Sequence, residues 1–161
     1  MRITFCGQAP SRETDGKPPF TGKCGKFLAE LMGTTQEQML KEHEFLNVLD
    51  RYPGPSIKGD KFPIPEAKIA AKKKLEQLRG RTVVLLGHNV ARAFGCERFA
   101  YFQWYEIRSP ENHEDVVVPL LTVVPHPSGT SRWYNSEENR MVAGKFLRTL
   151  ADSDKEKRGT M

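Results

Sequence analysis

The chain has 161 residues, of which 38% are hydrophobic and 28% charged, and it carries a formal net charge of +5 at pH 7. These values predict one soluble globular domain. They exclude a membrane-spanning protein, because no apolar run reaches the roughly 20 residues that a transmembrane helix needs. The first residues, MRITFCGQAP, lack the apolar stretch of a signal peptide, so we expect a cytoplasmic location. The positive charge is compatible with a polyanionic partner.

Strand and helix patterns alternate through the first half of the chain. Residues 2–6 (RITFC) are β-prone, and a glycine and a proline end the run. Residues 23–32 place apolar side chains at helical spacing until Gly33. Residues 45–49 (FLNVL) form a second apolar run, which the turn sequence YPGP ends. We therefore predict a strand, a helix and a strand in this order.

The same alternation continues in the second half. A helix is predicted near residues 65–79, and we interpret its lysine run, residues 72–74, as a solvated face, with DNA contact as the alternative. Residues 82–86 (TVVLL) are continuously apolar, as in a strand that is buried on both faces. The remaining elements are a helix from about Asn89, a strand over residues 116–124, which Pro119 interrupts, and a helix over residues 137–150.

This order of elements predicts the fold class. Strands that alternate with helices form an α/β domain, here a three-layer α/β/α sandwich around a central, mainly parallel four-stranded sheet with right-handed crossovers. We expect the domain to cover residues 1–151 and a flexible polar tail to cover residues 152–161.

The cysteines bear on cofactors. Cys6, Cys24 and Cys96 are odd in number and have no CxxC spacing. This pattern argues against a zinc site and against a disulfide scaffold. We therefore expect a reduced, intracellular protein without a metal ion or other cofactor.

An unusual loop follows each of the four predicted strands. The loops read GQAPSRETD, NVLDRYPGP, GHNVAR and HPSGTSRWYN. In open α/β sheets, ligands bind beyond the carboxyl ends of the strands, where such loops meet. We therefore expect the four loops to line one cleft.

Each loop also has a simpler interpretation. Gly87 before a helix resembles a phosphate-binding turn, but the chain lacks GxGxxG and the GK[ST] of a P-loop, which argues against nucleotide binding. His126 alone could be a core histidine, although its place before Pro127 holds the backbone extended and fixes the direction of its ring. Trp133 and Tyr134 could be packing residues.

Four motifs in order resemble the uracil-DNA glycosylase superfamily. Residues 7–28, GQAPSRETDGKPPFTGKCGKFL, are similar to its first motif, most closely in the iron–sulfur branch, where a GEAPG loop precedes a PFVGRAG-like stretch. Asn47 falls at the place of the base-reading asparagine, residues 83–94 resemble the third strand and its helix, and HPSGTSR over residues 126–132 resembles the histidine–proline–serine loop. The resemblance extends from about Arg2 to Leu150.

The resemblance implies a role for individual residues. Phe20 would stack on a flipped base, Asn47 would pair with the edge of a pyrimidine, and the small side chain of Ala9 would leave room beside the ring. His126 would donate a hydrogen bond to the pyrimidine O2 as the glycosidic bond breaks. The residues that would contact DNA are Pro10, Ser11, His88, Ser128, Gly129, Thr130, Ser131, Arg132, Trp133 and Tyr134.

The sequence also departs from the family pattern. The cysteine ligands of the iron–sulfur branch are missing, which predicts no cluster. Gln8 stands where that branch has a glutamate, and Ala9 stands where other branches have Asp or Asn. A glutamine cannot act as a base, but its amide oxygen can orient a water molecule. Asp15 matches the aspartate that closes the GEAPG segment of the family, so the resemblance implies that this carboxylate assists, with Glu13 as the other one nearby.

The activity that the resemblance implies is that of a monofunctional DNA glycosylase. Such an enzyme flips an aberrant or modified pyrimidine out of DNA and hydrolyses its N-glycosidic bond, which leaves an abasic site. The alternative is a DNA- or modified-base-binding module that has lost turnover. Uracil is the default substrate, and a 5-substituted pyrimidine, including a glycosylated one, is the rival. We expect a monomer that binds duplex or single-stranded DNA and no membrane, and that serves either base-excision repair or defence against phage DNA.

Overall fold

The computed structural model describes residues 3–57, 59–106, 119–128 and 131–159, with side chains up to residue 153 in the last helix. Its central sheet has the strand order β2-β1-β5-β7-β6. The parallel strands are β1 (Thr4–Gly7), β2 (Glu44–Asn47), β5 (Thr82–Leu86) and β7 (Leu120–Val124), and β6 (Trp104–Glu106) pairs antiparallel with β7 at one edge.

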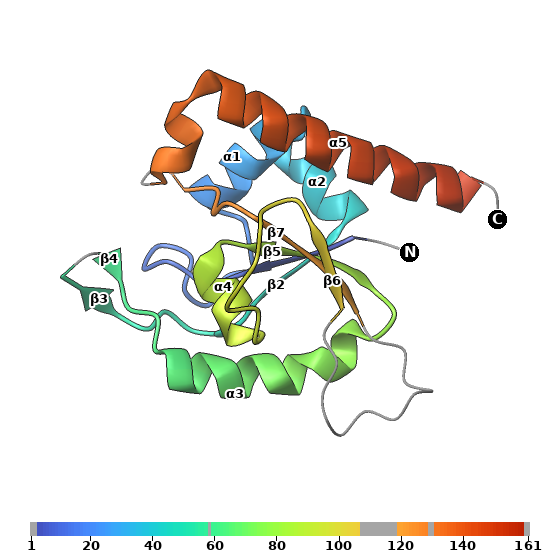
Figure 1. The fold of residues 1–161 in the computed structure, drawn as a ribbon. Helices are drawn as coiled ribbons and strands as arrows, with labels where there is room; N and C mark the ends of the chain where they lie inside the picture. Colours follow the sequence, from blue (N-terminus) through green and yellow to red (C-terminus); the bar gives the residue numbers. More distant parts are fainter. Residues whose placement is uncertain (1–2, 58, 107–118, 129–130, 160–161) are drawn as a thin grey trace.

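Helices cover both faces of this sheet, as Figure 1 shows. One layer contains α1 (Lys23–Leu31), α2 (Gln36–Glu42) and α5 (Glu137–Gly159). The other contains α3 (Ile64–Leu75), which the short 3₁₀ helix Glu76–Leu78 follows, and α4 (His88–Ala93). The predicted three-layer α/β/α fold is thus confirmed.

The sheet separates two hydrophobic cores because neighbouring side chains of a strand point to opposite faces. On β5, Val84 and Leu86 belong to the core under α1, α2 and α5, whereas Val83 and Leu85 belong to the core under α3 and α4. All four side chains are fully buried. This explains why residues 82–86 are continuously apolar.

The register of the strands places their carboxyl ends at one edge of the sheet. Gly7 of β1 aligns with Asn47 of β2, and Leu86 of β5 aligns with Val124 of β7. The loops that follow these residues therefore start side by side. A two-stranded hairpin, β3 (Pro55–Ser56) and β4 (Gly59–Asp60), projects from the loop after β2 and lies at the left in Figure 1.

The elements differ from the prediction in several places, including the hairpin β3–β4, which was not predicted. The sheet has a fifth strand, β6, which the sequence conceals because it is three residues long and mostly exposed at an edge. The unpredicted helix α2 begins after Thr35, whose side chain accepts a hydrogen bond from the Gln38 main-chain nitrogen at 3.2 Å. The helix α5 continues to Gly159, past its predicted end at residue 150, and the predicted strand residues 116–118 lie outside the described residues.

In the described part of the chain, no helix combines the length and the apolar character that crossing a bilayer requires.

Candidate active site

A cleft of about 420 Å³ lies at the carboxyl ends of β1, β2 and β7. This volume is in the range of small-molecule sites, roughly 300–1,000 Å³. The loop after β1 supplies most of its lining, the loop after β2 and the hairpin supply a smaller part, and His126 closes it from β7. Three of the four predicted loops therefore meet as expected. The loop after β5 is the exception, because in the described residues none of its side chains lines the cleft.

Gly7 lies at the point where the predicted base-binding residues meet. A Cβ atom at Gly7 would lie 2.6 Å from Cζ of Phe20 and 2.7 Å from Oδ1 of Asn47. Both distances are shorter than any real contact, so the aromatic ring and the amide approach the backbone as closely as they do only because residue 7 has no side chain. A face for stacking and an edge for hydrogen bonding are thus adjacent.

Phe20 has a left-handed backbone conformation, with a φ of 62°, which is strained for a bulky residue. The side-chain amide of Gln36, the first residue of α2, donates hydrogen bonds to the main-chain oxygens of Phe20 at 2.8 Å and of Gly22 at 3.0 Å. The Phe20 ring also packs against Phe45, with 5.4 Å between the ring centroids. These contacts hold the ring at the wall of the cleft.

Asn47 ends β2, and Lys74 of α3 fixes the backbone there. The Lys74 ammonium donates to the main-chain oxygens of Asn47 and, at 3.0 Å, of Val48, and it pairs with the Asp50 carboxylate at 2.8 Å. Its side chain is only 16% exposed. The lysine run is therefore not a uniform solvated face. Residues 72 and 73 are exposed, but Lys74 binds the backbone at the end of β2.

His126 follows β7 and lines the same cleft. Burial lowers its pKa below the ordinary value of 6.5, so its imidazole is neutral at pH 7. Gly87, with a φ of 100°, passes directly beside it: a Cβ at Gly87 would lie 3.0 Å from Cβ of His126. The loop after β5 thus contributes to the site through its backbone, which positions the histidine.

Gln8 and Ala9 both line the cleft. The main-chain oxygen of Gln8 accepts a hydrogen bond from the Leu49 nitrogen at 2.9 Å, which extends the pairing of β1 and β2 by one step. The backbone that carries the Gln8 side chain is therefore fixed. Glu13 is also at the cleft, and a hydrogen bond from its own main chain, together with one from Ser11, lowers its pKa, so it is ionised at pH 7.

The position of Asp15 disagrees with its predicted role as the assisting carboxylate. It does not line the cleft, and its carboxylate accepts hydrogen bonds from Arg51 Nε at 2.8 Å, Arg51 Nη2 at 3.0 Å and the Tyr52 nitrogen at 3.0 Å. These partners lower its pKa to about 2. A carboxylate held in this way is a poor base, and it ties the loop after β1 to the loop after β2. The sequence around Asp15 did not indicate that Arg51 would bind this carboxylate.

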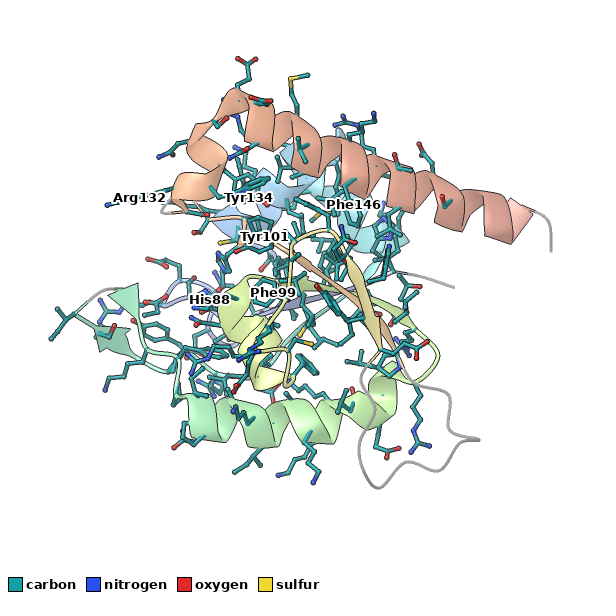
Figure 2. The ribbon with its side chains drawn as sticks, viewed as in Figure 1. His88, Phe99, Tyr101, Arg132, Tyr134 and Phe146 are labelled. Atoms are coloured by element: carbon teal, nitrogen blue, oxygen red, sulfur yellow. The ribbon has the colours of Figure 1, made fainter. Side chains whose placement is uncertain are left out.

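The loop after His126 also differs from the prediction in part. Tyr134 is only 4% exposed: its hydroxyl donates to the Pro125 oxygen at 2.7 Å and its ring contacts Phe27 edge-on, so it is a core residue and not a DNA contact. Trp133 is half-buried against the same core. Arg132 is exposed and projects outward in Figure 2.

The remaining predicted DNA contacts have varied positions. Gly129 and Thr130 lie outside the described residues, and Ser128 and Ser131, on either side of them, are half-buried. Pro10 and Ser11 line the cleft, and the Ser11 hydroxyl is hydrogen-bonded to the Thr14 hydroxyl at 2.9 Å. His88 is exposed at the start of α4, outside the cleft lining, and is labelled in Figure 2.

Sequence reasoning missed two kinds of residue in this site. Gln36 and Lys74 act through contacts with segments 14 or more residues away in sequence, and no local pattern signals such contacts. Three lysines also line the cleft: Lys17, Lys23 and Lys61. The first two flank the PPFTG segment of the first motif, so their positions in the sequence could have indicated that they lie at the cleft.

The cysteines do not gather. Cys6 is buried in the sheet, Cys24 lines the cleft and Cys96 is half-buried near α4. Among the described residues, no three His, Cys, Asp or Glu side chains are grouped as metal ligands.

The fold and the cleft define an α/β protein with a ligand site at the carboxyl ends of a parallel sheet. The model of the uracil DNA glycosylase superfamily matches residues 1–151. The chain therefore belongs to the uracil DNA glycosylase superfamily, whose members are DNA glycosylases and act on DNA. The resemblance seen in the sequence is confirmed at this level. A comparison with curated proteins gave no match.

Proposed function

We propose that this protein is a monofunctional DNA glycosylase that hydrolyses the N-glycosidic bond of a flipped pyrimidine and leaves an abasic site. The observation that carries the proposal is the meeting of Phe20 and Asn47 at Gly7, in the cleft that His126 also lines. A planar ring that enters this cleft finds an aromatic face, an amide edge and an imidazole together. Membership of the superfamily supplies the reaction class.

Recognition of the base divides between two side chains. The Phe20 ring provides a stacking surface, which suits every pyrimidine alike. The Asn47 amide has both donors and an acceptor, so it can pair with the polar edge of a pyrimidine. Because Gln36 and Lys74 fix the two backbones, little conformational freedom is lost when the base binds.

His126 is proposed to stabilise the leaving base. As the glycosidic bond breaks, the sugar becomes oxocarbenium-like and the electron pair remains on the pyrimidine, so negative charge grows at its O2 atom. A neutral imidazole donates one N–H hydrogen bond to that oxygen. A preorganised donor of this kind is worth roughly 3–4 kcal/mol in other enzymes. The lowered pKa of His126 is consistent with this neutral donor.

The water that captures the sugar needs less help. The Gln8 amide oxygen is proposed to orient it, since Gln8 lines the cleft and its main chain is fixed by Leu49. Glu13 replaces Asp15 as the assisting carboxylate, because it lines the cleft and is ionised at pH 7. The carboxylate also favours the positive charge that develops on the sugar.

For the substrate, we propose 5-substituted pyrimidines, glycosylated ones included, in addition to uracil. Ala9 contributes only a methyl group to the cleft lining, where a larger side chain would compete with a 5-substituent. The cleft continues to Asp60 and Lys61, whose polar groups can bind a hydroxymethyl or sugar substituent. Repair and phage defence are both roles for such an activity.

One observation favours a second function. By the resemblance of the first motif to the iron–sulfur branch, Gln8 stands where that branch has a glutamate, and a glutamine cannot act as a base. A binding module that keeps the base pocket without turnover would have this substitution.

One assay tests both functions. The protein is incubated with oligonucleotides that carry uracil, hydroxymethyluracil, hydroxymethylcytosine or its glucosylated form, and abasic sites are then cleaved with alkali. Release of a base from at least one oligonucleotide supports the glycosylase. If the protein binds the oligonucleotides but releases a base from none of them, the binding module is supported. If uracil exceeds every modified base by more than tenfold in kcat/KM, about 1.4 kcal/mol in the barrier, the proposal that 5-substituted bases are released as well as uracil is wrong.

A further inference from the structure

The strand order decides which side of the cleft a 5-substituent of the base faces. His126 follows β7, and Asn47 ends β2, and these two strands lie on opposite sides of β1 in the sheet. In a pyrimidine ring, C5 lies directly opposite C2. A base whose O2 faces His126 therefore points C5 away from β7, toward the β2 side of the cleft. The hairpin β3–β4, which projects from the loop after β2, forms that side.

The hairpin brings one carboxylate to this side of the cleft. Asp60 of β4 lines the cleft, and its Oδ1 atom accepts a hydrogen bond from the Tyr52 hydroxyl at 3.3 Å. The Tyr52 main-chain nitrogen donates to Asp15 at 3.0 Å, so the loop after β1 holds the tyrosine. The Lys61 nitrogen donates to the Gly54 oxygen at 2.8 Å, which closes the base of the hairpin. The position of the Asp60 carboxylate is therefore fixed by its tyrosine partner and by the closed hairpin.

The first turn of α1 faces the same part of the cleft. Cys24 lines the cleft, and burial, together with the negative charge of Asp60, raises the pKa of its thiol. The Asp60 carboxylate is thus close enough to α1 for its charge to act across this part of the cleft. Because the thiol is neutral at pH 7, it does not add to or offset that charge. A substituent on C5 would enter the space between these two groups.

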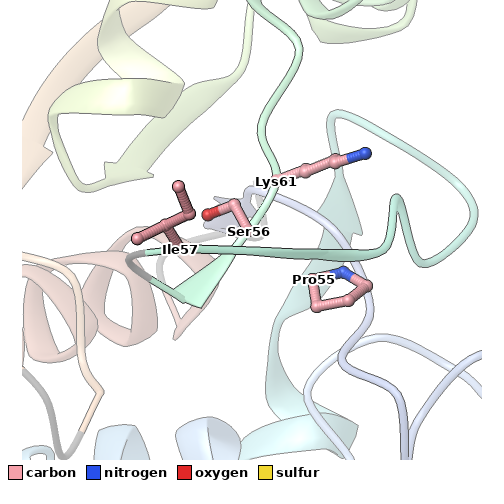
Figure 3. Close-up of a pocket in the computed structure, with 4 residues that line it drawn as sticks. All are labelled: Pro55, Ser56, Ile57 and Lys61. Atoms are coloured by element: carbon pink, nitrogen blue, oxygen red, sulfur yellow. The ribbon is translucent and has the colours of Figure 1, made fainter.

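Lys61, the next residue, has the opposite charge and also lines the cleft. In Figure 3 its side chain extends away from the hairpin turn, where Ile57 lies. The Lys61 side chain is exposed, whereas the Asp60 carboxylate is held by the Tyr52 hydroxyl. The charge that is fixed on this side of the cleft is therefore negative.

We propose that Asp60 selects among 5-substituted pyrimidines: it favours neutral substituents that carry hydroxyl groups and disfavours substituents that carry a carboxylate. A hydroxymethyl or sugar hydroxyl donates a hydrogen bond to the Asp60 carboxylate. A 5-carboxyl group brings a second negative charge next to the first one, which is unfavourable. The inference rests on the proposed function for the orientation of the base, and it adds the residue that selects the base and the class that this residue rejects.

The test compares the wild type with Asp60→Asn, which removes the charge but keeps the size of the side chain and a hydrogen-bond acceptor. Oligonucleotides carry uracil, 5-hydroxymethyluracil or 5-carboxyuracil, and kcat/KM is measured for each. We expect the ratio of the hydroxymethyl value to the carboxyl value to fall about tenfold in the variant, because one close like-charge contact is lost. The intrinsic reactivity of each base is the same for both proteins and cancels. An unchanged ratio overturns the inference and leaves the proposed function intact.

Two further variants serve as controls. Asp152→Asn makes the same change at an exposed position of α5 outside the cleft lining, and its ratio should equal that of the wild type. Lys61→Met removes the neighbouring positive charge, and its ratio should change less than about threefold, as for other exposed charges. A larger change for Lys61→Met than for Asp60→Asn would assign the selection to Lys61 and overturn the inference.

A binding measurement separates this inference from the proposed function. In a 2′-fluoro nucleotide the fluorine disfavours positive charge on the sugar, so the glycosidic bond resists cleavage while the base can still enter the cleft. Fluorescence anisotropy with such oligonucleotides should show tighter binding of the hydroxymethyl base than of the carboxyl base, and Asp60→Asn should lose this preference. If this result is obtained but no oligonucleotide releases a base, the proposed function fails and the role of Asp60 stands. Equal affinities of the wild type for the two bases overturn that role.

Discussion

The side-chain nitrogen of Gln36 lies 2.8 Å from the main-chain oxygen of Phe20, to which it donates, and 3.0 Å from that of Gly22. This one amide holds the segment in which Phe20 keeps its left-handed backbone. We expect Gln36→Leu to lower kcat/KM for base release about tenfold, because two carbonyls lose their donor and the ring loses its fixed position. Single-turnover and steady-state kinetics measure the effect.

Gln38 on the same helix is the matched control for this prediction. Its side chain is exposed and bonds only locally, to Glu42 at 2.8 Å. Gln38→Leu should therefore leave kcat/KM within twofold of the wild type. A loss of equal size in both variants would mean that the effect comes from α2 as a whole and not from the Phe20 contact.

His126→Ala should slow base release on the order of a hundredfold or more while DNA affinity changes little, because the donor acts on charge that appears only as the bond breaks. Rapid-quench single-turnover assays measure the rate, and fluorescence anisotropy measures the affinity. Since burial lowers the pKa of His126 below 6.5, its protonation should cause no inflection in the rate between pH 6.5 and 8. An unchanged rate in the variant removes His126 from the mechanism.

Lys74→Met should destabilise the protein by about 1–3 kcal/mol, because the part-buried main-chain oxygens of Asn47 and Val48 lose their donor. Lys73→Met, a substitution of the same size at the exposed neighbour, should change the free energy of unfolding by less than about 0.5 kcal/mol. Urea denaturation measures both values. Equal stability of the two variants would show that Asn47 does not depend on Lys74.

Asp15→Asn tests the link between two loops. The pKa of Asp15 is about 2 in the folded protein and 3.8 ordinarily, so the unfolded chain binds more protons between these values. The stabilisation is therefore fully present above pH 3.8 and is lost as the pH falls through 2. Asp15→Asn should lower the urea midpoint at pH 7, and its difference from the wild type should shrink as the pH falls from 3.8 through 2. A difference that stays constant over this range is not due to ionisation.

Arg132→Ala should weaken binding to all DNA sequences alike and lower the slope of log affinity against log salt by about one, as loss of one phosphate contact does. Arg79→Ala removes the same charge at an exposed site paired with Glu76, directly after the 3₁₀ helix Glu76–Leu78, and should leave the slope unchanged. Titrations at several salt concentrations measure the slopes. Weakening that depends on sequence would assign Arg132 to base contact.

The sequence predicted the layers and much of the cleft for one reason: the signals were local. Apolar runs marked the parallel strands. Two strands end in Gly7 and Asn47, and the loops after β1 and β7 bring Phe20 and His126 to the same edge of the sheet. The start of α2 also had a local signal, which the sequence analysis did not use: Thr35 followed three residues later by Gln38 is a typical helix N-terminus pattern.

The parts that escaped prediction depend on contacts between distant segments. Lys74 looked solvated because its neighbours are, and only the packing of α3 turns it toward the end of β2. Asp15 looked catalytic until Arg51, 36 residues away, was seen to hold it. Tyr134 followed a motif of polar residues, yet its ring enters the core.

The strand order also decides when the cleft can form during translation. β1 is made first, but it lies between β2 and β5, and β5 in turn needs β7 as its other neighbour. The ribosome therefore releases Gly7 and Phe20 long before His126. The first strand lacks its neighbour β5 until residue 86 has emerged, and β5 lacks its neighbour β7 until residue 124 has emerged. A chain that stops before β7 lacks His126 and leaves one edge of β5 without its partner strand, and such unpaired strand edges favour aggregation.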